Sequence, residues 1–167
     1  MKELTENLNS KHRKKEFCCG KSLLDNYLHK QANQDVKRKL SACFVLRDEK
    51  TDLLKGYYTL ANSSIAQELI PEKFQKKLPN SYKSIPTTLL GRLAIDNRFQ
   101  GQGVGKLLLI DALRKSFDSS KSLGSFAVVV DPIDEDAERF YDKYGFIKLP
   151  DSGKMFLPMN TVRTLFE

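Results

Sequence analysis

The feature that most constrains the fold of this chain is a cluster of three glycines in the segment Gln100-Gly-Gln-Gly-Val-Gly105. An almost entirely apolar or β-branched run, Thr87–Ile95, precedes it, and apolar residues at helical spacing follow over Leu107–Phe117. A turn between a strand and a helix is therefore expected. Because glycine has no Cβ, such a turn can adopt positive φ angles, and successive N–H groups can converge on an anion at the positive end of the helix dipole. The cluster predicts a phosphate-binding turn.

Two well-known phosphate-binding motifs do not match this segment. In a P-loop, four residues separate the first glycine from Gly-Lys-Ser/Thr, but Gly101 and Gly105 are one residue too close, and Leu107 stands where the magnesium-binding hydroxyl belongs. The dinucleotide fingerprint Gly-x-Gly-x-x-Gly is disfavoured, because the third glycine comes one residue early and the segment lies in the middle of the chain, not in a first βα unit. A third interpretation stays open, in which the glycines only allow a strand and a helix to pack closely.

Helical and strand patterns alternate along the rest of the chain, which favours an α/β or α+β architecture. At 167 residues the chain is expected to form a single domain over residues 1–167. We expect an amphipathic helix over Ser22–Gln34, an antiparallel hairpin of Ser41–Arg47 and Gly56–Ala66, and a short helix inside the long loop Ile70–Pro86. A buried strand over Ser125–Val130, a helix over Asp134–Lys143 and terminal strands at Phe146-Ile147 and Met155–Leu157 are expected to follow.

The chain carries a formal net charge of +7, and its positive residues fall in three runs. Any one run is compatible with ordinary solvated surface, but three on one small domain favour a polyanionic partner, either a nucleic acid or a nucleotide cofactor. The runs are residues 11–15, the segment Lys37-Arg38-Lys39, and a looser group of Lys73, Lys76, Lys77 and Lys83.

Cysteine content and hydropathy indicate the compartment. The three cysteines are odd in number and offer no metal-ligand spacing, so we expect neither disulfides nor a metal site. The N-terminal residues lack the apolar core of a signal peptide, and no apolar run approaches the roughly 20 residues that a membrane-spanning helix needs. A cytoplasmic protein with no membrane association is expected.

The glycine segment resembles the signature of the GNAT acetyltransferase superfamily, Gln/Arg-x-x-Gly-x-Gly/Ala, which Gln100, Gly103 and Gly105 match in order. The resemblance implies a mixed, mostly antiparallel central sheet flanked by helices, with acetyl-CoA as cofactor. In that family the backbone amides of the turn hold the pyrophosphate, and the preceding strand binds the pantetheine arm. The implied cofactor-binding residues are Leu93, Ala94, Ile95, Gln100, Gly101, Gln102, Gly103, Val104, Gly105 and Lys106.

A second motif lies about 30 residues further on. Asp134, Ala137, Tyr141 and Gly145-Phe146 resemble a later helix of the family, with Asp134 in place of the usual Asn, and both residues are good helix N-caps. Acetyl transfer from a thioester leaves a thiolate, which is expelled more easily if a hydroxyl protonates it. The resemblance nominates Tyr141 as this acid. Without the family match, an aromatic residue at this position would be interpreted as part of the core.

The sequence offers no evident general base, because its two histidines, His12 and His29, lie beside no motif; His29 is expected at the surface. This favours an α-amine as acceptor, since its pKa of about 7.7–8.0 leaves a neutral fraction at pH 7, whereas a lysine amine near 10.4 would need a base.

Within the superfamily, the chain most resembles the toxins of bacterial toxin–antitoxin pairs that acetylate aminoacyl-tRNA. The similar segments include Phe17-x-Cys19-Gly20, Gly56–Leu60 and above all Leu90-Gly-Arg-Leu-Ala94. The resemblance implies aminoacyl-tRNA as substrate and a ribbon-helix-helix antitoxin as partner. The candidate tRNA contacts are Lys73, Lys76, Lys77 and Lys83, followed by Lys37, Arg38 and Lys39.

Two other functions stay open at this point. The chain could act on a small amine or a protein N-terminus, without salt-sensitive tRNA binding. It could also be a non-catalytic acyl-CoA or nucleic-acid-binding module, which would not depend on Tyr141. The oligomeric state is open as well, and a homodimer is compatible with the sequence.

Overall fold

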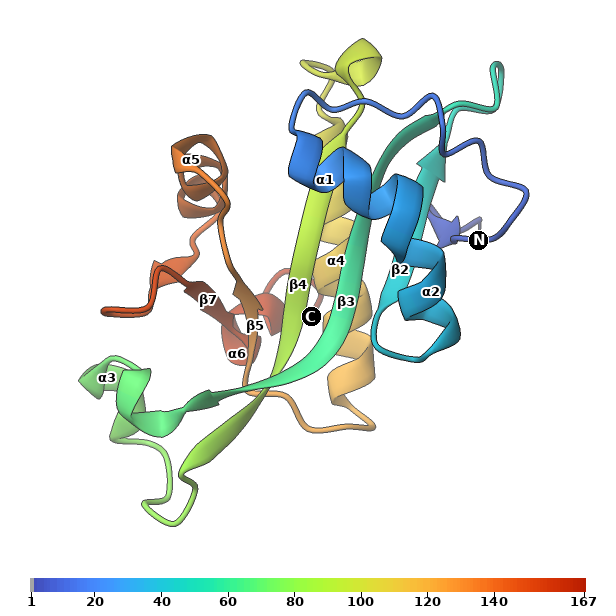
Figure 1. Ribbon diagram of the computed structural model, residues 1–167. Coiled ribbons are helices and arrows are strands. Elements are labelled where there is room, and N and C mark those ends of the chain that lie inside the picture. The colour runs from blue at the N-terminus through green and yellow to red at the C-terminus, as the bar shows by residue number, and fades with distance from the viewer. Residues whose placement is uncertain (1) are drawn as a thin grey trace. The chain divides into compact units, whose positions relative to one another are not determined.

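The computed structural model of the chain describes residues 2–167 and contains a seven-stranded mixed sheet with the strand order β1-β2-β3-β4-β5-β7-β6 (Figure 1). Two compact units make up the chain: one consists of the residues up to Ala61 together with Gly91–Leu113, and the other of Asn62–Leu90 and Arg114–Glu167. Strands β3 (Leu54–Ala66) and β4 (Ser84–Ile95) each contribute residues to both units. The predicted fold class, a mixed and mostly antiparallel sheet with helices, is confirmed.

The strands of the first unit form an antiparallel meander. β1 (Glu6–Asn7) pairs with β2 (Ala42–Arg47), and β2 pairs with β3 in a register that places Phe44 opposite Tyr58. The β-branched and aromatic residues of β2 and β3 suit a pleated, partly buried surface. The predicted hairpin is therefore confirmed, although β3 begins two residues earlier than expected.

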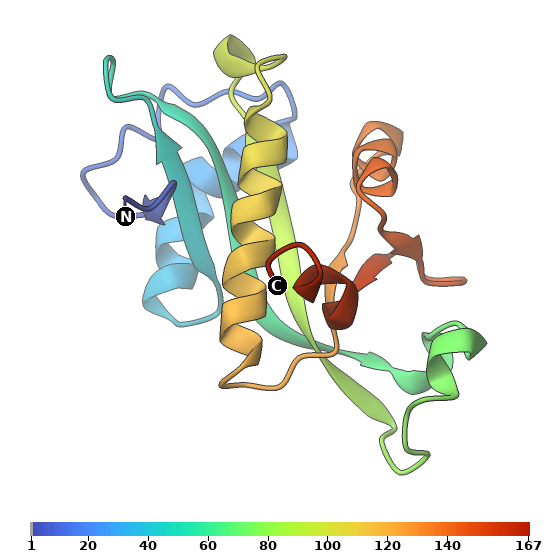
Figure 2. The same ribbon diagram turned by 180° about the vertical axis from the view of Figure 1, so that it is seen from behind.

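Two helical layers cover the strands of this unit. One layer is a continuous helical segment made of α1 (Ser22–Asn26), the π-helical turn η1 (Tyr27–Gln31) and α2 (Ala32–Lys37). It lies on one face of β2 and β3, and α4 (Val104–Ser120), which begins in this unit, lies on the other (Figures 1 and 2). The predicted helix is confirmed, but its π-helical turn was not expected.

Apolar side chains join the helical segment to the strands of this unit. Residues of the helical segment pack with residues of β2, β3 and β4; the buried set includes Leu24, Tyr27, Leu28, Ala32, Val45, Tyr57 and Ala94. Glycine is required at position 56, because a Cβ there would lie 2.7 Å from both the Ala94 carbonyl oxygen and Leu108 Cδ1. This close approach sets the distance between β3 and α4.

The second unit is built around β5 (Ala127–Val130), all four residues of which are buried. β5 runs parallel to β4 and antiparallel to β7 (Met155–Pro158), which also pairs with β6 (Ile147–Lys148). This confirms the prediction of a strand covered on both faces. The helices are α3 (Glu72–Gln75), near the beginning of β4, α5 (Glu135–Lys143), beyond the end of β5, and α6 (Met159–Arg163) (Figure 1).

The loop before β4 is anchored to this second unit by its own apolar residues. Phe74 and Leu78 pack on a cluster that includes Ile70, Ile85 and Phe156, and the rings of Phe74 and Phe156 meet edge to face at 5.3 Å. The charged residues of the loop are left at the surface. Within residues 2–167, no helix is both long and apolar enough to cross a bilayer.

Candidate functional site

The glycine segment forms a turn between the end of β4 and the start of α4, as predicted. Gly101 and Gly103 have φ angles of +77° and +78°, a region that L side chains rarely adopt. A Cβ at either position would have no neighbour within 4 Å, so backbone conformation, and not lack of space within the chain, demands glycine here. Gly105, in contrast, lies in the first turn of α4 and has no positive φ.

The start of α4 leaves backbone N–H groups without an intrahelical partner next to these glycines. The first hydrogen bond of the helix runs from the Leu107 N–H to the Gly103 carbonyl, at 3.2 Å. The N–H groups of the residues before Leu107 have no acceptor inside the helix, because helix geometry supplies none to the first turn. Together with the helix dipole, these groups favour an anion. The turn can therefore hold a phosphate or pyrophosphate.

The strand before the turn offers free backbone on one side. β4 pairs with β5 over Thr88–Leu90, and β5 ends at Val130, whereas β4 continues to Ile95. The segment Leu93–Ile95 therefore extends past the end of β5. On that side its N–H and C=O groups have no β5 partner, and the Ile95 carbonyl accepts a side-chain hydrogen bond from Gln100. An extended ligand can pair with the other groups as an additional strand would.

A buried carboxylate, which the sequence analysis did not single out, fixes the chain just ahead of the glycines. Asp96 is 1% exposed and accepts hydrogen bonds from the backbone N–H groups of Arg98, at 2.9 Å, and Cys18, at 3.1 Å. The Arg98 guanidinium donates two more, of 2.8 Å each. Burial raises the pKa of Asp96, but these hydrogen bonds outweigh it and hold the pKa below its ordinary value.

The segment before α1 is tied to the same turn. Asn97 donates its backbone N–H to the Cys18 carbonyl at 2.8 Å, and the Gln100 amide Nε2 lies within 3.1 Å of the Cys19 carbonyl and 3.0 Å of the Ile95 carbonyl. The side chain of Gln100 is thus engaged inside the protein, which leaves its backbone free to face a ligand. Lys106 is exposed in the first turn of α4.

Tyr141 lies in α5, in the second unit. Its ring is 7% exposed and contacts the rings of Phe140 and Phe146, with centroids 5.3 and 5.2 Å away. Burial raises the pKa of the Tyr141 hydroxyl, so it stays protonated at neutral pH. The helix begins as predicted, since the Asp134 side chain accepts from the Ala137 N–H at 2.8 Å, and it ends before Gly145, whose φ is +91°.

The predicted tRNA contacts all lie at the surface. Lys73, Lys76, Lys77 and Lys83 are exposed along the loop before β4 in the second unit, whereas Lys37, Arg38 and Lys39 are exposed at the end of α2 in the first. The four lysines thus share the loop before β4, and the other three basic residues share the end of α2. The structure places Leu93–Ile95 and Gln100–Lys106 together in the first unit.

Both histidines are engaged in hydrogen bonds within the protein. His12 Nε2 contacts the Glu6 carboxylate at 2.9 Å while its Nδ1 accepts from the Asn9 N–H. His29 is partly buried, not fully at the surface as expected, because its Nε2 donates to the Phe17 carbonyl at 2.8 Å. Neither ring is arranged as a free base.

Comparison with known proteins agrees with this geometry. Residues 39–148 match the family model described as "Acetyltransferase (GNAT) domain". A "tRNA-acetylating toxin" from Mycobacterium tuberculosis is 34% identical over 151 residues, which cover 89% of this chain and 87% of the relative.

Two solved structures of AtaT have the same fold. The toxin complexed with acetyl-methionyl-tRNAfMet superposes with a TM-score of 0.89, at 31% identity, with 98% of each chain covered. A tyrosine-to-phenylalanine mutant of AtaT, bound to the C-terminus of the antitoxin AtaR and to acetyl-CoA, superposes with a TM-score of 0.81, at 28% identity, with 97% of this chain and 96% of that one covered.

Proposed function

The chain belongs to the GNAT acetyltransferase superfamily, and from this premise we propose that it is a toxin that acetylates the α-amino group of aminoacyl-tRNA and so blocks translation. As a member of that family it is an acetyl-CoA-dependent N-acetyltransferase. The proposed substrate is supported by the likeness to the tRNA-acetylating toxin and to AtaT in complex with acetyl-methionyl-tRNAfMet, which extends over nearly the whole chain.

The glycine turn is the observation that carries the proposal. Left-handed Gly101 and Gly103 stand directly before a 17-residue helix, and the space around both is open, so the residues present fit a bound pyrophosphate. Acetyl-CoA, when bound, supplies the activated acetyl group as a thioester. We assign the cofactor contacts to Leu93, Ala94, Ile95, Gln100, Gly101, Gln102, Gly103, Val104, Gly105 and Lys106.

Tyr141 is the proposed general acid. Its hydroxyl is protonated at neutral pH because burial raises its pKa, so it can donate a proton to the sulfur that leaves when the amide bond forms. The surrounding rings of Phe140 and Phe146 restrict the phenol to one orientation. A phenol that is protonated and held in one orientation is suited to donate a proton to one fixed atom.

The acceptor is proposed to be an α-amine attached to a polyanion. An α-amino group needs no strong base near neutral pH, in keeping with the engaged state of both histidines. The exposed lysines of the loop before β4, and next the basic end of α2, are the proposed contacts with tRNA phosphates.

A ribbon-helix-helix antitoxin would hold the toxin inactive, by analogy with AtaT bound to the C-terminus of AtaR. The protein would act in the cytoplasm, where charged tRNA is found. Residues 1–167 would work as a single acetyltransferase domain, since β3 and β4 belong to both compact units.

Mass spectrometry of total charged tRNA tests the proposal directly. After incubation with the protein and acetyl-CoA, one or more aminoacyl groups should gain one acetyl group, and the gain should be absent without the protein. Acetylation of small amines or protein N-termini with none of charged tRNA would favour an ordinary acetyltransferase. Unchanged activity in living cells after loss of the Tyr141 hydroxyl would favour a non-catalytic module.

A further inference from the structure

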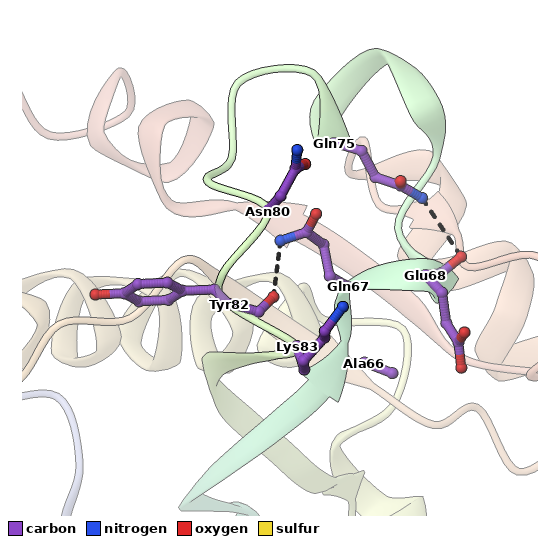
Figure 3. A pocket seen from close by; sticks show the side chains of 7 residues that line it. All are labelled: Ala66, Gln67, Glu68, Gln75, Asn80, Tyr82 and Lys83. Atoms are coloured by element: carbon purple, nitrogen blue, oxygen red, sulfur yellow. Dashed lines mark hydrogen bonds between the residues drawn. The ribbon is translucent and has the colours of Figure 1, made fainter.

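The loop before β4 and the end of β3 line an open pocket of about 480 Å³ in the second unit (Figure 3). Its lining includes Gln67, Glu68 and Gln75, which follow β3, and Asn80, Tyr82 and Lys83, which precede β4. The proposed function makes no use of it beyond a phosphate contact for Lys83.

Hydrogen bonds hold this pocket in shape. Gln67 donates its backbone N–H to the Lys83 carbonyl at 2.9 Å, and its amide Nε2 reaches the carbonyls of Pro79, at 2.9 Å, and Tyr82, at 2.8 Å. Gln75 donates to the Glu68 carbonyl at 3.4 Å. Binding there would order few additional groups, because the loop is already fixed.

Tyr82 is the most unusual side chain at this pocket. It is 57% exposed, whereas each of the other aromatic residues within 2–167 is buried or partly buried. Its ring projects outward from the loop, away from Gln67, and forms a flat apolar surface beside the pocket (Figure 3). An exposed ring of this kind suits a planar ligand that stacks on it.

The charges around the ring identify the ligand class. Lys83 follows Tyr82 directly, and Lys73, Lys76 and Lys77 lie on the same exposed loop, so a phosphodiester chain is attracted to it. The Glu68 carboxylate is an acceptor only, which suits the exocyclic amino group of cytosine or adenine. A stacking ring, cations and an amino-group acceptor together are typical of sites for unpaired nucleotides.

We propose that this pocket and the Tyr82 ring bind the unpaired 3′ CCA end of the acceptor arm, on which tRNA carries its amino acid. The inference rests on the proposed function. An unpaired end is required because a base inside a duplex cannot offer its face to the ring. Cytosine and adenine, the two base types of CCA, both carry an exocyclic amino group that can donate a hydrogen bond to the Glu68 carboxylate.

The test measures binding of two uncharged RNA hairpins by fluorescence anisotropy at fixed salt. One carries an unpaired 3′ ACCA end and the other is blunt. The wild-type protein should bind the first hairpin about tenfold or more tightly than the second. Tyr82→Ala should lose this preference, and Tyr82→Phe should keep it because the ring is retained. Affinity for acetyl-CoA should be equal in all three proteins.

A second measurement examines the carboxylate. Uridines in place of the cytidines of the overhang present a carbonyl to Glu68, so wild-type affinity should fall, whereas Glu68→Ala should bind both overhangs equally. The proposed site would be wrong if the wild-type protein bound the blunt and ACCA hairpins equally well. It would also be wrong if Tyr82→Ala and Tyr82→Phe lost the preference for the ACCA hairpin to the same extent.

Acetylation of charged tRNA separates this inference from the proposed function. If charged tRNA is not acetylated but the ACCA preference depends on the Tyr82 ring, the proposed function fails and the RNA-end site stands. If Tyr82→Ala acetylates charged tRNA with unchanged kcat/KM, the site is wrong and the function stands.

Discussion

The carboxylate of Asp96 and the guanidinium of Arg98 meet in a two-pronged pair, with Nε to Oδ1 and Nη2 to Oδ2 distances of 2.8 Å each. Arg98 also donates to the Glu16 carbonyl at 3.0 Å, and Asp96 accepts from the Cys18 N–H. The pair therefore joins the end of β4 to the segment before α1, immediately ahead of the glycine turn.

Asp96→Asn is expected to lower the free energy of unfolding by about 2 kcal/mol at pH 7, since hydrogen bonds to a buried charge are lost or weakened. Affinity for acetyl-CoA should fall as well, because the turn loses its anchor. Chemical denaturation and calorimetry measure the two effects. The control, Asp118→Asn, changes an exposed carboxylate of α4 and should alter neither quantity.

The stability lost in Asp96→Asn should depend on pH. Because the folded-state pKa of Asp96 is lowered, its contribution is fully present above the unfolded-state value of about 3.9 and is lost as the pH falls through the folded-state pKa. The difference in stability between wild type and Asp96→Asn should thus be constant from pH 5 to 8 and shrink in stronger acid. A difference that grew on acidification would contradict the assignment.

Gly103→Val is expected to abolish detectable acetyl-CoA binding while the protein stays folded. The positive φ of +78° strains any residue with a Cβ, at a cost of about 1–3 kcal/mol, and the new side chain would occupy the open space proposed for the pyrophosphate. Calorimetry measures the affinity, and thermal unfolding the strain.

Gly153→Val is the matched control for this substitution. Gly153 has a φ of +73° and equally open surroundings, but lies in the turn before β7. It should show similar strain and normal acetyl-CoA affinity. If both variants bind the cofactor normally, the glycine turn is not the pyrophosphate site.

Tyr141→Phe should reduce kcat by about 10²–10⁴ with nearly unchanged affinity for acetyl-CoA, because the packing on Phe140 and Phe146 is kept and only the proton donor is removed. Since burial raises the pKa of Tyr141 above its ordinary value of about 10, the wild-type rate should show no alkaline decline from this acid below pH 10. Tyr144→Phe is the control. Near-normal turnover of Tyr141→Phe would assign the acid role to another group.

Local patterns made much of this architecture predictable. The glycine spacing predicted the turn and the helix that follows it, and Asp134 predicted the start of α5, because both depend on residues that are close in sequence. The continuous apolar run predicted the buried strand β5 for the same reason.

Features that depend on distant residues could not be predicted in this way. The hydrogen bond from Cys18 to Asp96 joins residues 78 positions apart, and no local pattern indicates it. The hydrogen bond between His29 and Phe17, which leaves the histidine only partly exposed, depends on how the helical segment packs. The exposure of Tyr82 could not be predicted from the sequence either, since an aromatic residue in a lysine-rich loop is equally compatible with a core position.

Substituting glutamine for the lysines of the loop before β4 should weaken binding of charged tRNA in a salt-dependent way. If Lys73, Lys76, Lys77 and Lys83 neutralise phosphates, each removal should reduce the slope of log affinity against log salt by roughly one unit. Lys50→Gln, in the exposed turn of the first unit, is the control and should leave the slope unchanged. Acetylation of a small amine should be unaffected, because no part of that reaction uses the loop. A flat salt dependence in the wild type would show that these lysines do not bind tRNA phosphates, and the basic end of α2 would be no better a candidate.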